Sequence, residues 1–395
     1  MKNVAGFALT VSALFLAVVA VFIQAPSLFY MGTALFATIG ACNLQAYFAV
    51  RGLRFERVAP GSAQLGDTVT VEITAWSERK LRRPLIMVLD RLPKRLRVSR
   101  LSPSLPIAPA YDLPVRTQYQ FEAVRRGVYR WRGVTVVGTD ALGLVTKTRD
   151  YETDPAEITI LPRAIPVTVE MPMAAGWGIS EAESGQTRGA GIEPRGIREY
   201  AYGDSLRHVH WRSTARAGRL LVKEFEAGTH AAAAFVLPRK NGSDVGPGPT
   251  SSLDLMCGHA VFLADGLLRQ GARVEFPALE PAGRSVSAHE RESEILELLA
   301  RIQADTEASL AADALVALDR LTPGSVVFIM TALPEEELIG AVAQLCQRSV
   351  TVVMLVYNAR SFDKKSKVTA CDPVYMERLH SAGAHVEVME ASEKP

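Results

Sequence analysis

The stretch SVVFIMTALPEEELIGAVAQLCQRSVTVVMLVY, residues 325–357, contains two apolar runs separated by a helical pattern. The runs at 325–333 and 350–357 are rich in Val, Ile and Phe, and they predict buried strands. Between them, residues 334–347 open with proline and three acids, which is typical of the first turn of a helix. A strand, a helix and a second strand in this order predict part of an α/β domain with parallel strands.

The same alternation extends in both directions from this stretch. Further strand-like runs lie at 231–238, 272–279 and 384–389, and helical patterns lie at 253–271, 293–305, 310–321 and 373–383. Strands that alternate with helices predict a mostly parallel sheet covered by helices on both faces. Ligands of such sheets usually bind at the carboxyl ends of the strands.

Residues 55–165 carry the pattern of an all-β domain. Val69, Val71 and Ile73 alternate with polar residues, as in a half-buried strand. Similar short runs follow, with Gly and Pro between them, and together they predict a β-sandwich-like domain. Residues 166–196 are rich in glycine and in small or polar residues, which predicts a flexible linker.

The N-terminal stretch indicates a membrane anchor. No charged residue occurs in residues 3–50, and this is long enough for two spans of about 20 residues each. Pro26 disfavours one continuous helix, so residues 4–23 and 28–50 predict a transmembrane hairpin. A cleaved signal peptide is the alternative interpretation, since Lys2 precedes the first apolar run. The second run would remain as an anchor in either case.

The flanking charges predict the orientation of the hairpin. Lys2 precedes the first span, Arg51, Arg54 and Arg57 follow the second, and the connecting loop carries no charge. Basic residues remain on the cytoplasmic side. The sequence therefore predicts a multi-pass protein of the inner (plasma) membrane, with residues 51–395 cytoplasmic.

The second apolar run contains two polar residues, Asn43 and Gln45. We expect both to lie near the membrane surface and to contact headgroups or water. Hydrogen bonding to a neighbouring helix is the alternative. The lipid bilayer is the expected environment of residues 4–50.

Composition and motif searches exclude several functional classes. The net charge is +2, from 44 basic and 42 acidic residues, so no broad basic footprint for nucleic acid is expected. The four cysteines are far apart in sequence, which favours neither a zinc ribbon nor a disulfide framework. No P-loop, His-Glu-x-x-His or Gly-x-Ser-x-Gly motif occurs. We therefore expect no nucleic-acid partner, no cofactor and no metal.

Residues 195–226, RGIREYAYGDSLRHVHWRSTARAGRLLVKEFE, are the segment densest in charged and aromatic residues. In a structural interpretation, Asp204 caps a short helix, Gly218 ends it, Leu220 begins a strand and Trp211 is a core residue. In a functional interpretation, the arginines and aromatic residues form a surface that binds an acidic segment or phosphate. Seven basic residues against four acids, or seven minus four, leave this segment with a charge of +3.

Two histidines in this segment, His208 and His210, raise the question of a metal site. On a helix, residues two apart point to different faces, and zinc needs three or four ligands. No third ligand lies nearby, so we expect both histidines to be partly exposed polar residues.

The same segment resembles the signature of the DUF58 family. The matching residues are Arg198, Tyr200, Gly203, Asp204, Arg207, Trp211, Ala215, Arg216 and Glu224. RRGVYRWRGVTV at 125–136 and DALGL at 140–144 are similar to recurring phrases of that family. The resemblance covers nearly the whole chain and implies a C-terminal fold like a von Willebrand factor A domain. It also implies a MoxR-type AAA+ ATPase and a transglutaminase-like membrane protein as partners, and it implies no established reaction.

The chain departs from the pattern of metal-binding A domains, which carry Asp-x-Ser-x-Ser after the first strand. Pro238 stands at the place of the Asp, Arg239 and Lys240 follow it, and Thr331 stands where a later acid is expected. Proline has no ligand atom, and a hard cation needs oxygen ligands. We therefore expect the metal site of this fold to be lost.

These observations predict four segments: a transmembrane hairpin at 1–54, a β-sandwich-like domain at 55–165, a flexible linker at 166–196, and the DUF58 motif with a von Willebrand factor A-like α/β domain at 197–395. The leading hypothesis is a non-enzymatic, membrane-anchored interaction or assembly module. One alternative is a hydrolase with a site around Asp204 and His210. Another is a metal-dependent adhesion-type binder.

Overall fold

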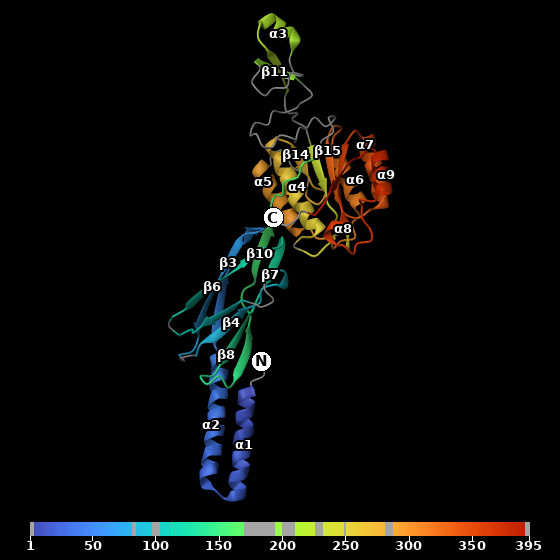
Figure 1. Cartoon of the computed structure of the whole chain (residues 1–395). Helices are drawn as coiled ribbons and strands as arrows, with labels where there is room; N and C mark the ends of the chain where they lie inside the picture. Colours follow the sequence, from blue (N-terminus) through green and yellow to red (C-terminus); the bar gives the residue numbers. More distant parts are fainter. Residues whose placement is uncertain are drawn as a thin grey trace. The chain divides into compact units, whose positions relative to one another are not determined.

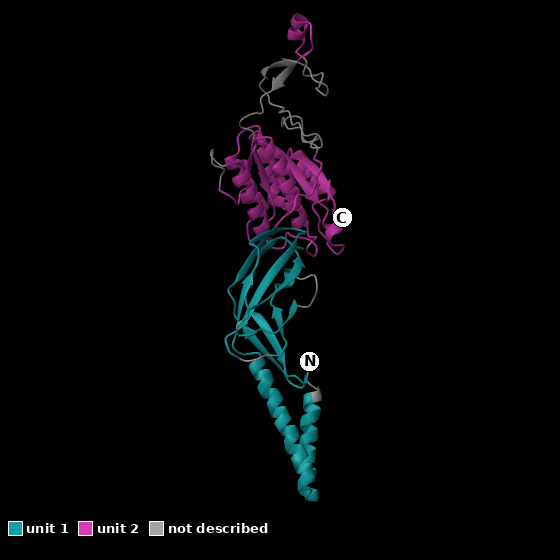
Figure 2. Ribbon diagram, turned by 90° about the vertical axis from the view of Figure 1, so that its left-hand side faces the viewer, with its two compact units in different colours: residues 1–160 teal, residues 161–395 magenta. Residues whose placement is uncertain are grey.

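The computed structural model describes residues 4–80, 84–96, 103–111, 113–169, 194–199, 210–225, 232–248, 250–280 and 287–391, and for residues 4–5, 194–199 and 222–225 it describes the backbone only. The chain divides into two compact units, residues 1–160 and 161–395 (Figure 2). Each unit has hydrophobic cores of its own.

Unit 1 begins with two apolar helices, α1 (Val4–Ile23) and α2 (Pro26–Ala49) (Figure 1). Pro26 lies in the first turn of α2, where a missing backbone N–H costs no hydrogen bond. Both helices are long and apolar enough to cross a membrane, by length and composition. Their large side chains are exposed, with Phe7 at 73% and Phe22 at 84%. Lipid would remove this apolar surface from water.

The rest of unit 1 is β-rich, as expected from residues 55–165. Its strands are β1 (Leu53–Val58), β2 (Ser62–Gln64), β3 (Thr68–Ser77), β4 (Ile86–Asp90), β5 (Ser104–Ile107), β6 (Val115–Glu122), β7 (Gly127–Trp131), β8 (Val134–Thr139), β9 (Thr146–Tyr151) and β10 (Ala156–Leu161). They form three sheets, ordered β1-β3-β6, β2-β10-β7 and β5-β4-β8-β9, and the pairings within them for which a register is defined are antiparallel. Alternate residues of these strands pack into one core.

Arg57 lies inside this β-rich body, which corrects one step of the orientation argument. Its side chain is 1% exposed, and its guanidinium donates to both carboxylate oxygens of Asp90, at 3.0 and 2.6 Å. Tyr119 and Trp131 also donate to Asp90. A charge held in a protein core does not act at the membrane surface, so Arg51 and Arg54 remain of the three arginines used to predict the orientation.

The last turns of α2 pack against β8 and β9. Ala141, in the loop between these strands, donates its N–H to Gln45 Oε1 at 3.1 Å. Gln45 therefore bonds to the β-rich body, a partner that the sequence does not indicate. Asn43 donates to Ile39 O within α2. A Cβ on Gly138 would lie 2.7 Å from Val50, so only glycine fits this approach.

Unit 2 contains the α/β domain predicted from the strand–helix alternation. Its strands are β13 (Ala232–Val236), β14 (Arg273–Glu275), β15 (Val326–Thr331), β16 (Thr351–Tyr357) and β17 (His385–Met389). Its helices are α4 (Ser252–Arg269), α5 (Ala288–Arg301), α6 (Leu310–Arg320), α7 (Glu336–Gln347), α8 (Ala359–Phe362) and α9 (Pro373–Ser381). The five strands form one parallel sheet in the order β14-β13-β15-β16-β17.

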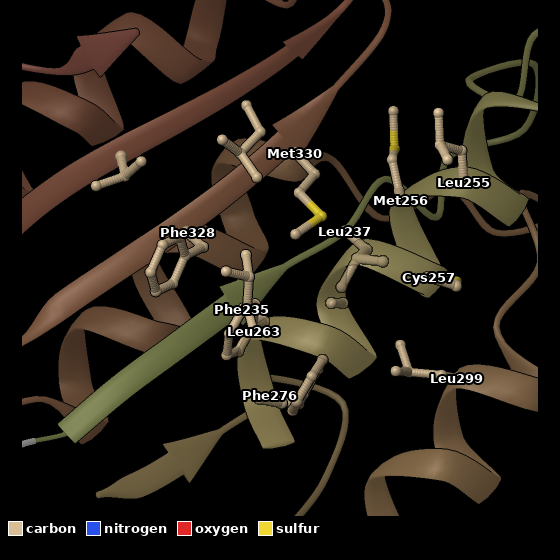
Figure 3. Packing of buried hydrophobic residues seen from close by; sticks show 14 of the residues in the cluster. Phe235, Leu237, Leu255, Met256, Cys257, Leu263, Phe276, Leu299, Phe328 and Met330 are labelled. Carbon is tan, nitrogen blue, oxygen red and sulfur yellow. The ribbon is translucent and has the colours of Figure 1, made fainter. Parts of the chain in front are cut away.

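Helices cover both faces of this sheet, as predicted. On one face, Phe235 and Phe328 stack 4.9 Å apart and pack with residues of α4 and α5 (Figure 3). On the other face, alternate residues of the same strands pack against α6, α7 and α9. Every residue of β13 and β15 is buried, which explains their continuous apolar runs.

One predicted strand is shorter than expected. The run at 272–279 forms β14 over three residues only, because the chain turns after Glu275. Leu279 N donates to Phe276 O in this turn, and Pro277 has no N–H for a sheet hydrogen bond.

The segment that precedes the α/β sheet holds a small antiparallel pair, β11 (Pro194–Glu199) with β12 (Leu221–Phe225), and the helix α3 (Trp211–Ala217). The last three residues of the predicted linker at 166–196 therefore belong to β11. Residues 170–193 of that linker lie outside the described part of the chain.

Candidate functional site

The first candidate site is the carboxyl edge of the parallel sheet next to β13. β14 lies on one side of β13 and β15 on the other, so the winding of the sheet reverses there. In doubly wound sheets, ligands bind beyond the carboxyl ends of the strands at this point. Ligand-binding side chains are therefore expected in the segments that follow Val236 and Thr331.

Arg239 occupies this edge and forms a bidentate ion pair with Asp313. Its Nε donates to Oδ2 at 2.9 Å and its Nη2 donates to Oδ1 at 2.6 Å. Hydrogen bonding to Asp313 raises the pKa of Arg239, and this outweighs the opposing effect of burial. Asp313 lies in the first turn of α6, where the helix dipole also favours a negative charge. The pair therefore attaches the end of β13 to α6.

The other acids at this edge also stabilise helix starts. Asp244 Oδ1 accepts from Leu253 N at 3.0 Å, at the start of α4. Glu335 accepts from the N–H groups of Leu310 and Ala311, at 3.2 and 3.1 Å, at the start of α6. Each carboxylate satisfies backbone donors that the helix itself leaves unpaired.

The donor groups at this edge do not fit a hard divalent cation. Pro238 is buried and has no ligand atom, and Thr331 Oγ1 donates to Leu333 O at 2.7 Å. A cation such as magnesium needs several oxygen ligands, whereas Asp313 already holds a guanidinium. Across the described residues, no group of three or more His, Cys, Asp or Glu side chains could hold a metal ion.

A second group of titratable residues, His259 and Tyr357, lies inside the α/β core. His259 Nδ1 and Tyr357 Oη are 2.8 Å apart, and the side chains are 6% and 0% exposed. Burial lowers the pKa of His259 to about 4, and burial raises the pKa of Tyr357. A neutral pair without access to solvent satisfies its own hydrogen bonds and offers no route to a substrate, so we assign it a structural role.

The third candidate is the surface of α3, within the segment that carries the charged signature. No residue of α3 is buried, and the Trp211 side chain is 67% exposed. Arg212 and Arg216 are exposed on the same short helix. A large aromatic side chain beside arginines, all open to solvent, is typical of a surface that anchors a partner.

The structural interpretation of this segment is partly correct. Gly218 ends α3 in the left-handed conformation with φ 65°, as expected. Trp211 is not a core residue in the described part of the chain, because its side chain is 67% exposed and no residue of α3 is buried. The helix begins after His210, whose Nδ1 accepts from Ser213 N at 3.2 Å. The N-cap of α3 is therefore His210, and Asp204, the predicted cap, lies outside the described residues.

Several predicted signature residues lie outside the described part of the chain, namely Tyr200, Gly203, Asp204 and Arg207, together with His208. For Arg198 in β11 and Glu224 in β12, the backbone alone is described. Their register places Arg198 opposite Val222 and Gly196 opposite Glu224. The antiparallel pair therefore brings two ends of the signature together on neighbouring strands.

The loop between β8 and β9 contains DALGL, residues 140–144, the sequence similar to a recurring phrase of the DUF58 family. Asp140 is 4% exposed, and its carboxylate accepts from Val145 N at 2.6 Å and from Leu142 N at 2.9 Å. Burial alone would raise the pKa of Asp140, but these bonds and one to Cys42 hold it below the ordinary value. Asp140 therefore shapes the loop that contacts α2, a contact that DALGL does not reveal in sequence.

The chain is similar to one known protein family. A family profile described as "Protein of unknown function DUF58" matches residues 196–363, less than half of the chain. No curated protein matches. Among solved structures, the PKD domain of an M14-like peptidase from Thermoplasmatales archaeon SCGC AB-540-F20 matches 27% of this chain and 91% of that domain, with 14% identity and a TM-score of 0.17. A likeness of this size indicates neither fold nor function.

Proposed function

We propose that this chain is a non-enzymatic, membrane-anchored interaction module that docks a partner through α3. One observation carries the proposal: Trp211 is 67% exposed on a helix that also exposes Arg212 and Arg216. Residues 195–226 hold seven basic residues and four acids, so the partner segment is acidic. An exposed tryptophan with neighbouring arginines is the combination that dominates binding energy in protein interfaces.

The carboxyl edge of the sheet supports a binding role over a catalytic one. Its acids, Asp244, Asp313 and Glu335, hold an arginine or helix N-termini. We retain the von Willebrand factor A-like identity of the α/β domain as part of the proposal, supported by its parallel sheet with helices on both faces. In this proposal the domain acts without a metal ion, because Pro238 and the Arg239–Asp313 pair occupy the edge.

The partner proposed here is the MoxR-type AAA+ ATPase that the resemblance implies, with a transglutaminase-like membrane protein as a further member of the assembly. α1 and α2 anchor the chain in the inner membrane, and residues 51–395 lie in the cytoplasm. Arg51 and Arg54 directly follow α2, which supports this orientation by the distribution of positive charge.

The test measures binding of the purified ATPase to the full-length protein in nanodiscs. We expect Trp211→Ala combined with Arg216→Glu to weaken binding at least about tenfold, since hot-spot truncations cost 2 kcal/mol or more. Val374→Ala combined with Arg360→Glu is the matched control, because it changes an exposed apolar and an exposed basic residue elsewhere in unit 2. Equal binding by both double variants, or no binding by the parent protein, contradicts the proposal.

A further inference from the structure

The end of the β-rich body that adjoins α2 exposes large apolar side chains. Four of them, Leu85 (59% exposed), Tyr111 (45%), Leu113 (69%) and Leu142 (64%), form what we call the membrane-side rim. Single exposed apolar residues are common on protein surfaces. Here, however, the strand registers place all four at one end of the body.

Two of the rim residues are located by the sheet that contacts α2. Leu85 directly precedes Ile86, which pairs with Gly138, and a Cβ on Gly138 would touch Val50 and Ala49. Leu142 lies in the loop that joins β8 to β9 directly beyond Gly138. Both residues therefore lie where the body meets α2.

The other two rim residues are located by the sheet that follows α2. Ser77 pairs with Leu53, the first residue of β1, and its N–H donates to Ala110 O. Tyr111 is the next residue along the chain. Leu113 lies two residues before Val115, which pairs with Ala75, beside the start of β1.

The β8–β9 loop runs alongside the apolar helices. Ala141 N bonds to Gln45, which lies four residues, or about 6 Å, before the end of α2. Leu144 and Val145 help line a cavity of about 200 Å³ whose other lining residues are Gly6, Phe7, Thr10, Ile39 and Asn43. Ile39 lies about 15 Å before the end of α2. If α1 and α2 cross a bilayer, this loop lies within its interfacial layer.

The loop can enter an apolar environment because its polar groups are satisfied internally. Asp140 is its only charged residue, and the carboxylate accepts from Val145 N and Leu142 N. Gln45 accepts from Ala141 N. Backbone groups without partners would cost several kcal/mol each in a bilayer, and these bonds avoid that cost.

Cations and aromatic side chains surround the rim. Arg51 lies over the ring of Tyr47 at 3.9 Å, and Lys80 lies over the ring of Tyr111 at 5.3 Å. Lys147 is exposed and pairs with Gly138 across the strands. Aromatic rings with adjacent Lys and Arg are characteristic of the layer where lipid headgroups lie. Juxtamembrane cations attract anionic lipids.

We propose that the membrane-side rim rests in the lipid bilayer beside the hairpin, with Leu142 among the acyl chains and Lys80 and Lys147 bound to phosphates of anionic lipids. This inference rests on the membrane anchor of the proposed function, but on no protein partner. The β-rich body is thereby held at the membrane by a surface as well as by α2. A bilayer fits better than a protein partner because the rim continues the apolar surface of the hairpin.

The test places a spin label at position 142 of the full-length protein in nanodiscs, by Leu142→Cys in a background in which the four native cysteines are Ala. Val58→Cys is the matched control, since Val58 is 57% exposed at the opposite end of β1, and Leu14→Cys in α1 is the lipid reference. We expect the label at 142 to collide with oxygen more than with a water-soluble nickel chelate, as at position 14, and the label at 58 to show the reverse.

Two outcomes at position 142 would overturn the inference. A label that collides with the nickel chelate as freely as at position 58 lies in water. A label shielded from both reagents is covered by protein, which assigns the rim to a protein interface. Release of the protein by alkaline extraction of membranes would refute the anchor itself, so a failure of the proposed function is recognised separately.

The role of the cations is tested with the lipids that remain bound in native mass spectrometry. We expect Lys80→Gln combined with Lys147→Gln to lose most of the phosphatidylglycerol that the parent protein retains from mixed nanodiscs with phosphatidylcholine. Lys364→Gln combined with Lys365→Gln, two exposed lysines after α8, should retain it. Equal retention by both double variants refutes the assignment of Lys80 and Lys147.

Discussion

Removing the Asp90 carboxylate should unfold the β-rich body more readily than any change to a surface acid. Asp90 is fully buried and accepts four hydrogen bonds, two from Arg57, one from Tyr119 and one from Trp131, at 2.6 to 3.3 Å. In Asp90→Ala the Arg57 guanidinium, whose side chain is 1% exposed, stays buried with no negative partner. A buried charge that loses its partner costs about 3–5 kcal/mol.

The ion pair formed by Arg91, the residue next to Asp90, provides a matched control. Arg91 pairs with Asp150, but these side chains are 49% and 61% exposed. Water replaces such a partner, so Asp150→Ala should cost only about 0–1 kcal/mol. Both substitutions delete one carboxylate from an Arg–Asp pair of the same body, and they differ mainly in burial.

Hydrogen exchange of the full-length protein in detergent would measure the two effects. Peptides from β3 and β6 report the free energy of opening of the β-rich body separately from unit 2. We expect Asp90→Ala to lower this free energy by about 3–5 kcal/mol, a large part of the 5–15 kcal/mol of a typical domain. If Asp90→Ala lowers protection no more than Asp150→Ala does, the Arg57–Asp90 pair does not organise this core.

Two further predictions concern unit 2. Burial lowers the pKa of His259 from 6.5 to about 4, so between these pH values the unfolded chain binds a proton that the folded domain does not. The stability of unit 2 should therefore fall by up to about 3 kcal/mol as the pH drops from 6.5 to 4. His259→Phe should remove this contribution to the pH dependence of the melting curves. Asp313→Ala should lower the free energy of unfolding of unit 2 by about 1.5–3 kcal/mol. Asp265→Ala removes the half-buried acid of a pair whose Arg269 side chain is 76% exposed, and it should cost only about 0.5 kcal/mol. Magnesium should leave the Tm of the parent protein unchanged.

Much of the fold is predictable from local patterns. The continuous apolar runs at 325–333 and 350–357 predict buried parallel strands, because a strand covered on both faces needs no polar residues. Pro26 and Gly218 mark the ends of helices through their backbone constraints alone. In each case the residues that determine the helix or strand lie within it or directly beside it in sequence.

The features that local sequence does not reveal are mainly contacts between residues distant in sequence. Arg57 reads as a surface charge beside a membrane span, and Asp90, which buries it, lies 33 residues further on. Gln45 reads only as a polar residue near the membrane surface, and nothing local indicates its hydrogen-bond partner Ala141, which is 96 residues away. Trp211 reads as core because large aromatic residues are usually buried, but α3 has no buried face. Composition cannot reveal these long-range contacts or the exposure of a particular aromatic residue.

The distribution of charged groups favours binding at exposed surfaces over binding in a cleft. In the described residues, the carboxylates at the switch point of the sheet neutralise Arg239 or cap helices, so they are not available to polarise a substrate or hold a cation. Among the described residues, α3 and the membrane-side rim each combine exposed aromatic or apolar area with positive charge. Both combinations favour large, anionic partners. The two surfaces differ in what surrounds them: the rim adjoins apolar helices, whereas the described neighbour of α3 is the short strand β12. That difference supports the proposals made above, a bilayer for the rim and an acidic protein segment for α3.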